Sequence, residues 1–262
     1  MTKLKVGIVQ TRPSMNFDRS LKLALALSER LAEAGADIIC LPEAWHHPLP
    51  YSNIDEMIGK SNEILEKFRL LSDSYGITIL PGAIYEEIDK EKYITAPILD
   101  KKGNILGRQH KVHLYLEETK FFKTNKKYNV FSINGYKIGI LICHDIVFPE
   151  TARLLSLKNA DLIFNPSKIE SDGIDPWKLY LKVRCLENRI PIVGVNVSIF
   201  PEYPGQSVLY QPKQHVDSNV CYPEEIIKAE KRVQIFLGEI DLDIMRKLRS
   251  ERFKERIPEA YK

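Results

Sequence analysis

The chain has 262 residues, of which 44% are hydrophobic and 28% are charged, and its 38 Lys and Arg residues nearly balance 35 Asp and Glu residues. This length suits one large α/β domain, and a formal net charge of +3 is too small to indicate a nucleic-acid partner. We therefore expect a single domain over residues 1–262, without nucleic acid among its partners.

The start of the chain and its cysteines bear on location and on metals. Residues 1–6 lead directly into an apolar strand pattern, which leaves no room for a signal peptide, and no run approaches the roughly 18 apolar residues of a membrane-spanning helix. The four cysteines, at positions 40, 143, 185 and 221, lack the spacing of a zinc site. The sequence predicts a cytoplasmic protein with no membrane partner, no metal and no disulfide framework.

Apolar periodicity predicts alternating strands and helices along the chain. Strands are expected at residues 5–10, 37–42, 77–85, 93–99, 105–109, 136–143, 160–167, 192–198, 207–210 and 234–241. Helices are expected at residues 18–34, 58–75, 149–157 and 177–188. Residues 100–104 predict a hairpin turn, so the strand pairs should run in both senses.

Two stretches of the chain are similar to each other. The strands predicted on either side of the first helix match those around the third, and in each pair the second strand ends with a proline and a polar residue. We infer two related β-helix-β units, although short apolar repeats also arise by coincidence. Periodicity alone predicts a mixed α/β sheet with helices on its faces.

Three separated residues carry groups that can cleave an amide. Cys143 stands between a buried strand pattern and a helix, at a turn that can hold a nucleophile outside the strand end. Alone, it would be interpreted as a small core residue. Glu43 also follows a strand, where open α/β sheets place their sites, and Lys111 lies among alternating apolar and polar residues. Either could alone be a solvated end residue.

Together, in this order, these residues and their neighbours resemble the nitrilase superfamily, the carbon-nitrogen hydrolases. The motifs that carry the resemblance are residues 5–10, 41–43, 111–114, 143–145, 148–150, 184–189, 205–207 and 238–242. The resemblance implies a four-layer α-β-β-α sandwich with two mixed sheets and pseudo-symmetric halves. It also implies no cofactor and a homodimer, with residues 243–262 and 177–188 as candidate interface elements.

The chain departs from the family pattern in two places. The family usually carries a second glutamate shortly before an aromatic pair and a glycine; by its offset from the Phe pair at 121–122 we take Glu118, with Glu117 as the alternative. A surface glutamate is the other interpretation of Glu118. The glycine is replaced by residues 123–125, and His144 stands where an aromatic residue commonly follows the cysteine. Substrate preference is therefore open.

The resemblance implies a role for each group. A free thiol, with a pKa near ~8.5, is mostly protonated at neutral pH and needs a base. Glu43 would accept the proton of Cys143 and later pass it to the leaving amine. Lys111 and the backbone N–H of His144 would stabilise the oxyanion, and Glu118 would hold Lys111 charged and oriented.

The expected reaction is hydrolysis of a small linear amide through a cysteine thioester, releasing ammonia and a carboxylic acid. An N-carbamoyl amino acid hydrolase, which would also release carbon dioxide, and a non-catalytic interaction protein on the same fold are the alternatives. His144 is either a substrate contact or a satisfied structural histidine. The residues expected near the substrate are His144, Trp45, Tyr115, Phe148, Ser167 and Lys168.

Overall fold

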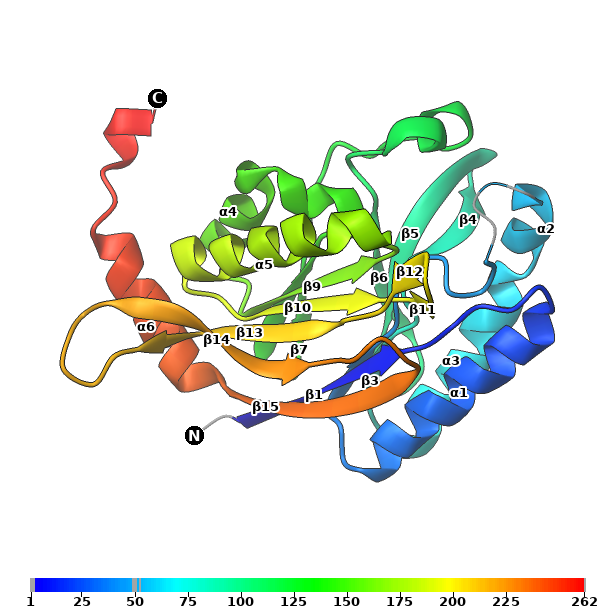
Figure 1. Ribbon diagram of the computed structural model, residues 1–262, viewed down its shortest axis with the longest axis horizontal. Helices are drawn as coiled ribbons and strands as arrows, with labels where there is room; N and C mark the ends of the chain where they lie inside the picture. The colour runs from blue at the N-terminus through cyan, green and yellow to red at the C-terminus, as the bar shows by residue number, and fades with distance from the viewer. Residues whose placement is uncertain (1–2, 49–50, 52, 262) are drawn as a thin grey trace.

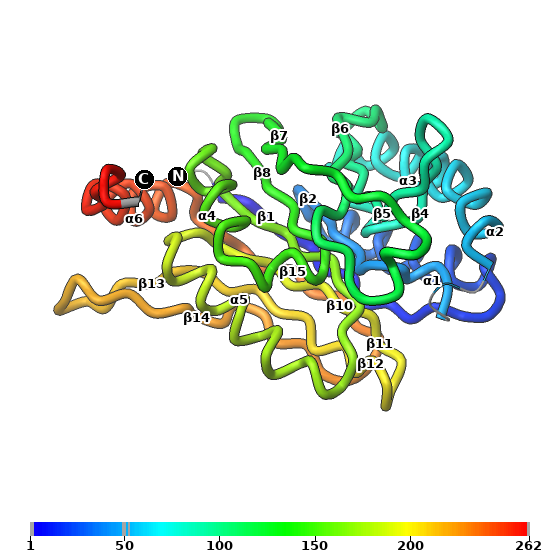
Figure 2. The backbone as a smooth tube through the Cα atoms, turned by 90° about the horizontal axis from the view of Figure 1, so that it is seen from above, coloured from blue at the N-terminus to red at the C-terminus, as the bar shows by residue number. Residues whose placement is uncertain are grey.

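The computed structural model describes residues 3–48, 51 and 53–261, and its elements form four layers (Figure 1). Helices α1 (Phe17–Glu33) and α3 (Ser61–Tyr75) cover one sheet, while α4 (Pro149–Leu157) and α5 (Ile174–Asn188) cover the other. The two helix layers lie on opposite sides of the strands (Figure 2). The α-β-β-α sandwich implied by the family resemblance is confirmed.

The first sheet has seven strands, in the order β15-β1-β2-β3-β5-β4, with β6 paired to β5. The strands β1, β2 and β3 are parallel, and the remaining pairs are antiparallel. Their bounds are β1 (Lys3–Gln10), β2 (Ile38–Cys40), β3 (Thr78–Leu80), β4 (Ile84–Ile88), β5 (Glu91–Leu99), β6 (Ile105–His110) and β15 (Gln234–Asp241).

The second sheet has six strands, in the order β14-β13-β10-β9-β8-β7, and its central strands β8, β9 and β10 are parallel. Their bounds are β7 (Val130–Ile133), β8 (Tyr136–Ile140), β9 (Leu162–Ser167), β10 (Ile192–Asn196), β13 (Val208–Gln214) and β14 (Cys221–Lys228). Shorter or terminal elements complete the chain: α2 (Ile54–Gly59), α6 (Leu242–Lys254), β11 (Ser198–Ile199), β12 (Tyr203–Pro204) and the 3-10 helices η1 (Leu116–Lys120), η2 (Cys143–Val147), η3 (Ser171–Gly173) and η4 (Pro258–Tyr261).

The two β-helix-β units have matching geometry. In the first, the backbone N–H of Lys5 donates to the carboxylate of Asp37 at 2.9 Å; in the second, that of Lys137 donates to Asp161 at 2.9 Å. A glycine in β8 lets the helix approach the strand, since a Cβ on Gly139 would lie 2.7 Å from a methyl carbon of Leu155. The pseudo-symmetric halves inferred from the sequence are therefore confirmed.

Three apolar clusters hold the layers together. The largest lies between the sheets, where Val6 and Ile8 of β1 join Ile138 and Ile140 of β8 in one core. The other two lie between a sheet and its own helices. Because both faces of each central strand are buried, these strands are continuously apolar, which made them recognisable in the sequence.

The structure differs from the predicted elements at several boundaries. The sequence predicts one strand over residues 77–85, but β3 and β4 are separate because Gly82, at φ +84°, turns the chain between them. The helix predicted over residues 58–75 is likewise divided into α2 and α3. The strand predicted over residues 136–143 ends at Ile140, and η2 begins at Cys143.

Helix α6 packs on the second unit near the carboxyl end of the chain. Arg246 and Arg249 donate to the carboxylate of Asp161, at 2.9 and 3.1 Å for their closest contacts. In the described part of the chain, no helix combines the length and the apolar character that crossing a bilayer requires.

Candidate active site

Glu43 lies just beyond the carboxyl end of β2, at the boundary between the two halves. Its backbone N–H donates to the carbonyl oxygen of Ser167 in the second half, at 3.3 Å. The neighbouring turn is tight, since a Cβ on Gly82 would lie 2.0 Å from the carbonyl oxygen of Pro42. Glu43 is 4% exposed, so its carboxylate is held in a nearly dry position.

Lys111 follows β6 and is buried with an exposure of 1%. Its ammonium Nζ donates to Oε1 of Glu43 at 2.9 Å and to Oε1 of Glu118 at 2.8 Å. Burial alone would lower the pKa of Lys111, but Glu43, Cys143 and Glu118 outweigh it and raise that pKa well above its ordinary value. The lysine is therefore charged at neutral pH.

Glu118 and Glu117 are adjacent in η1 but face different surroundings. The second oxygen of Glu118, Oε2, accepts from the backbone N–H of Tyr115 at 2.8 Å, which fixes the carboxylate against Lys111. Burial raises the pKa of Glu118, against the opposing effect of Lys111. Glu117 instead pairs with Lys120, and both side chains are more than half exposed. The structure thus brings Glu118, not Glu117, to the lysine.

Cys143 occupies the turn after β8 in a left-handed backbone conformation, with φ +48°. Asn165 donates to its carbonyl oxygen at 3.2 Å, which helps to hold this strained turn. Burial and the nearby Glu43 raise the pKa of the thiol well above its ordinary value, and Lys111 only partly offsets them. The resting sulfur is protonated, so its reaction requires a base.

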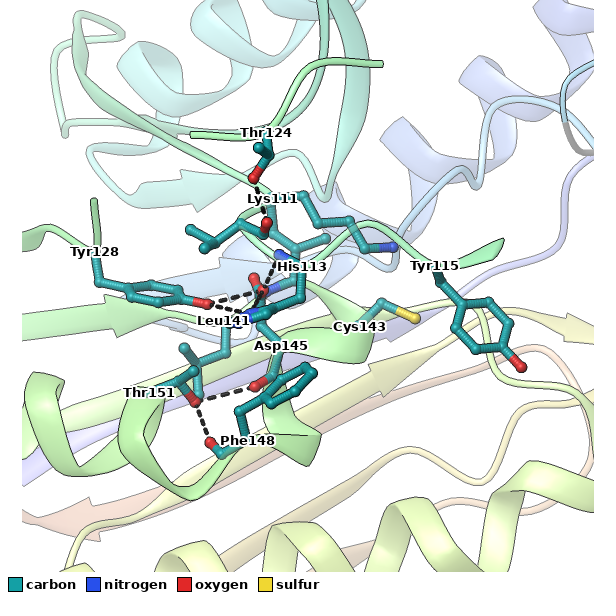
Figure 3. Close-up of polar contacts among 12 residues, drawn as sticks. Lys111, His113, Tyr115, Thr124, Tyr128, Leu141, Cys143, Asp145, Phe148 and Thr151 are labelled. Atoms are coloured by element: carbon teal, nitrogen blue, oxygen red, sulfur yellow. Dashed lines mark hydrogen bonds and ion pairs between the residues drawn. The ribbon is translucent and has the colours of Figure 1, made fainter. Parts of the chain in front are cut away.

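A buried aspartate joins the lysine loop to the cysteine turn (Figure 3). Asp145 Oδ1 accepts from the backbone N–H of His113 at 2.8 Å and from the hydroxyl of Tyr128 at 2.8 Å, and it lies 2.9 Å from Nδ1 of His113. Its Oδ2 accepts from the backbone N–H of Ile142 at 3.0 Å. In Figure 3 the sulfur of Cys143 and the ammonium of Lys111 extend to the same side of this cluster.

A cavity of about 410 Å³ opens onto these groups. Glu43, Glu118 and Cys143 form its inner wall, and the acidic, basic and thiol groups that the sequence singled out therefore meet at one site. Three of the residues expected near the substrate also line it, namely Tyr115, His144 and Lys168.

The other three expected contacts lie elsewhere, and those expectations need correction. Trp45 is fully buried between α3 and the first sheet, with its Nε1 donating to the carbonyl oxygen of Pro81 at 2.6 Å. Phe148 stacks on His113, with 3.8 Å between ring centroids, and Ser167 turns its hydroxyl to Asn165. Adjacency to a motif did not reveal the direction in which each side chain points.

Several wall residues were missed by sequence reasoning. Tyr51, Tyr85 and Tyr203 supply aromatic surface, and Glu170 lies on the exposed rim. They lie in loops or strands outside the recognised motifs, and nothing in the sequence indicated that their side chains face the site. Among residues 3–48, 51 and 53–261, no group of three or more His, Cys, Asp and Glu side chains could hold a metal ion.

Lys168 is a second basic residue beside the cysteine. Its Nζ donates to the carbonyl oxygen of Pro48 at 2.8 Å and lies 4.9 Å from the ring centroid of Tyr203. Burial lowers the pKa of Lys168 to about 8, although Glu43 and Glu170 act in the opposite direction.

Comparison with known proteins identifies the family. Residues 5–229 match the family described as carbon-nitrogen hydrolase. The 2-oxoglutaramate amidase of Bacillus subtilis is 27% identical over 205 residues, covering 76% of this chain and 79% of that protein. A nitrilase of Pyrococcus abyssi is 28% identical over 273 residues, covering 98% and 99%.

Solved structures show the same fold. The carbon-nitrogen hydrolase of Helicobacter pylori superposes with a TM-score of 0.87 at 17% identity, covering 99% of this chain and 97% of that one. Because the family match spans most of the chain, the chain belongs to the nitrilase superfamily and is a carbon-nitrogen hydrolase.

Proposed function

We propose that the protein is an amidase that hydrolyses small linear amides through a thioester on Cys143, releasing ammonia and a carboxylic acid. The observation that carries this proposal is the buried ammonium of Lys111, bound by Glu43 and Glu118 in the wall of the cavity that also holds Cys143. The 2-oxoglutaramate amidase of Bacillus subtilis supports it, since that relative is named for an amide substrate.

The first half-reaction forms the thioester. Glu43 accepts the thiol proton of Cys143 as the sulfur attacks the carbonyl carbon. Oε1 of Glu43 accepts from Lys111, so we assign the proton to Oε2, the other oxygen of this carboxylate. Lys111 and the backbone N–H of His144 stabilise the oxyanion. Glu43 then protonates the nitrogen, the carbon–nitrogen bond breaks and ammonia leaves.

The second half-reaction restores the enzyme. Glu43 accepts a proton from water, whose oxygen attacks the thioester carbon and forms a second oxyanion beside Lys111. The carbon–sulfur bond breaks, the sulfur regains its proton, and the carboxylic acid leaves. Since Lys111 stays charged and paired to Glu118, its field is available in both half-reactions without reorganisation.

The test is ammonia release from a panel of small amides, nitriles and carbamoyl compounds, with carbon dioxide measured in parallel. We expect amides to release ammonia alone, and rapid acid quenching followed by mass spectrometry to show the acyl group on Cys143. Cys143→Ala should abolish both signals, while Cys221→Ala, which changes a partly exposed cysteine outside the cavity wall, should keep them.

Three results would contradict the proposal. Carbon dioxide released with the ammonia would identify an N-carbamoyl hydrolase instead. Turnover that survives in Cys143→Ala, or silence of the wild-type protein across the panel, would reject the thioester mechanism on this substrate class.

A further inference from the structure

Lys168 is the one Lys or Arg among the described residues that line the cavity. It follows β9 directly, so a rigid parallel strand fixes its backbone. One of its three ammonium protons is used by the carbonyl oxygen of Pro48, and the ring of Tyr203 covers another side. The remaining donor capacity is available to a molecule in the cavity.

Lys168 has no carboxylate partners comparable to those of Lys111. No carboxylate of the described residues lies within 4.0 Å of its Nζ, whereas Lys111 has two. The acidic residues of the cavity rim, Glu117, Glu170 and Asp172, are exposed, so water and salt weaken their field inside. Glu43, inside the cavity, favours the charged form of Lys168 but does not outweigh the effect of burial. A partly buried cation without a carboxylate in contact is costly, and an anionic ligand would relieve that cost.

The position of Lys168 relative to the nucleophile sets where such an anion would bind. The backbone of Lys168 lies near the thiol of Cys143, since it lowers the pKa of that thiol against the stronger effect of burial, and both residues line the cavity. An acyl group attached to Cys143 therefore begins beside the lysine backbone, and its far end can meet the ammonium.

We propose that Lys168 binds a carboxylate at the far end of the substrate, so that the substrates are monoamides of short dicarboxylic acids. This inference rests on the proposed amidase function and adds a specificity-determining residue to it. Lys111 serves the carbonyl oxygen at the reacting end, and Lys168 serves the carboxylate at the opposite end.

The experiment compares two pairs of amides of similar length. Succinamate and glutaramate carry a terminal carboxylate, whereas pentanamide and hexanamide end in a methyl group. For the wild-type protein we expect kcat/KM to favour the charged pair, and Lys168→Met to lower the charged-to-neutral ratio by about 10- to 100-fold, which is the usual value of a hydrogen bond between charged groups. Lys168→Arg should restore much of the ratio, because it keeps the charge.

A matched control is Lys182→Met, which removes an exposed lysine of α5 that lies over Tyr210 outside the cavity wall. This variant should keep the wild-type ratio. A wild-type preference for the neutral amides, or an unchanged ratio in Lys168→Met, would overturn the role of Lys168 and leave the amidase proposal standing.

A binding measurement separates the two proposals. Calorimetric titration of Cys143→Ala with glutarate should give binding that is weakened by about 10-fold or more when Lys168→Met is added. If glutarate binds in this way while no amide is hydrolysed by the wild-type protein, the carboxylate site stands and the proposed amidase function fails. If glutarate binds equally to both variants, the carboxylate site is rejected.

Discussion

Glu118 and Glu117 are chemically identical neighbours with different partners. Comparing substitutions at the two positions tests the role of Glu118 in holding Lys111. Glu118→Gln keeps the shape of the side chain but removes a negative charge from Lys111. We expect kcat to fall at least about 10-fold, because the ammonium that faces the oxyanion is no longer held by two carboxylates. Steady-state kinetics on the best amide of the panel would measure this.

Glu117→Gln is the matched control for that substitution. It changes an exposed residue of the cavity rim that pairs with Lys120 and does not contact Lys111, and exposed pairs of this kind contribute about 1 kcal/mol or less to stability. Its kcat should stay within about twofold of the wild-type value. Equal losses in the two variants would show that the charge of the loop, not contact with Lys111, governs the rate.

The pKa of Lys168 predicts a pH dependence that is specific to carboxylate substrates. Since burial lowers this pKa to about 8, the side chain is charged below that pH and neutral above it. We expect kcat/KM for glutaramate to fall as the pH rises through about 8, and the value for hexanamide to lack this step. Lys168→Arg should remove the step, since a guanidinium stays charged.

The other groups that act on Lys168 do not reproduce this step. Glu43, Glu170 and Cys143 all favour its charged form, and the pKa of Cys143 lies well above the range in question. Burial lowers the pKa of His46, whose charge would oppose that of Lys168, to about 3, so His46 remains neutral. Identical pH profiles for glutaramate and hexanamide would therefore contradict the assignment.

For single residues, the sequence was a good guide to which side chains meet in the site. It was a poorer guide to which side chains line the cavity. Glu43, Lys111 and Cys143 were recognisable because each stands at a strand end within an ordered set of motifs. Side-chain direction was not recognisable, because a loop has no periodicity to fix it. Thus Trp45 follows Glu43 closely in sequence, but its side chain points into the apolar core between the first sheet and its own helices.

Among the elements, α6 packs through apolar residues such as Met245 and Leu248, and two of its arginines form ion pairs with one buried carboxylate, that of Asp161. Asp161→Asn would leave Arg249, which is 7% exposed, without a counter-charge, and we expect a loss of about 3 kcal/mol in the free energy of unfolding. Asp37→Asn, at the equivalent position of the first unit, changes a carboxylate that accepts a backbone hydrogen bond but forms no ion pair among the described residues. Asp37→Asn should lower the free energy of unfolding by about 1 kcal/mol or less.

Urea unfolding of both variants would measure the difference, and its pH dependence has a definite sign. Burial alone would raise the pKa of Asp161, but hydrogen bonds from Arg246, the Lys137 backbone and Arg249 outweigh it and lower the pKa. The stabilisation is complete above the unfolded pKa of about 3.9 and is lost as the pH falls through the lowered folded value. Equal costs for the two variants at neutral pH would disprove the anchoring role.

The two edge strands of the second sheet that the sequence failed to predict share a physical cause. The strand β14 is partly exposed along most of its length and contains Pro223 and two adjacent glutamates, so it has neither an apolar run nor a clean alternation. The edge strand β7 is short and follows a basic segment. Central strands, buried on both faces, had the clear pattern that these edge strands lack.

For the whole molecule, the family resemblance predicts a homodimer through α5 and the C-terminal segment. Helix α5 exposes Leu179 and Val183, and α6 exposes Ile244, which are apolar side chains that a partner could cover. We expect sedimentation velocity to show a species of two 30.2 kDa chains. Leu179→Glu combined with Val183→Glu should shift it toward the monomer.

The control for the dimer is Leu70→Glu, which places one such charge at a similarly exposed leucine on α3, away from α5 and α6. This variant should sediment as the wild-type protein does. A monomeric wild-type protein at micromolar concentration would refute the dimer prediction.

The contact between Glu43 and Ser167 has a consequence for how a bound acyl group would lie in the molecule as a whole. These residues hold equivalent positions in the two halves, and the hydrogen bond between their backbones marks the seam along which the halves join. The sulfur belongs to one side of that seam, and the acid and the ammonium belong to the other. In the proposed mechanism, an acyl group would be covalently bound to the second half alone and would meet the first half only through non-covalent contacts with Glu43 and Lys111.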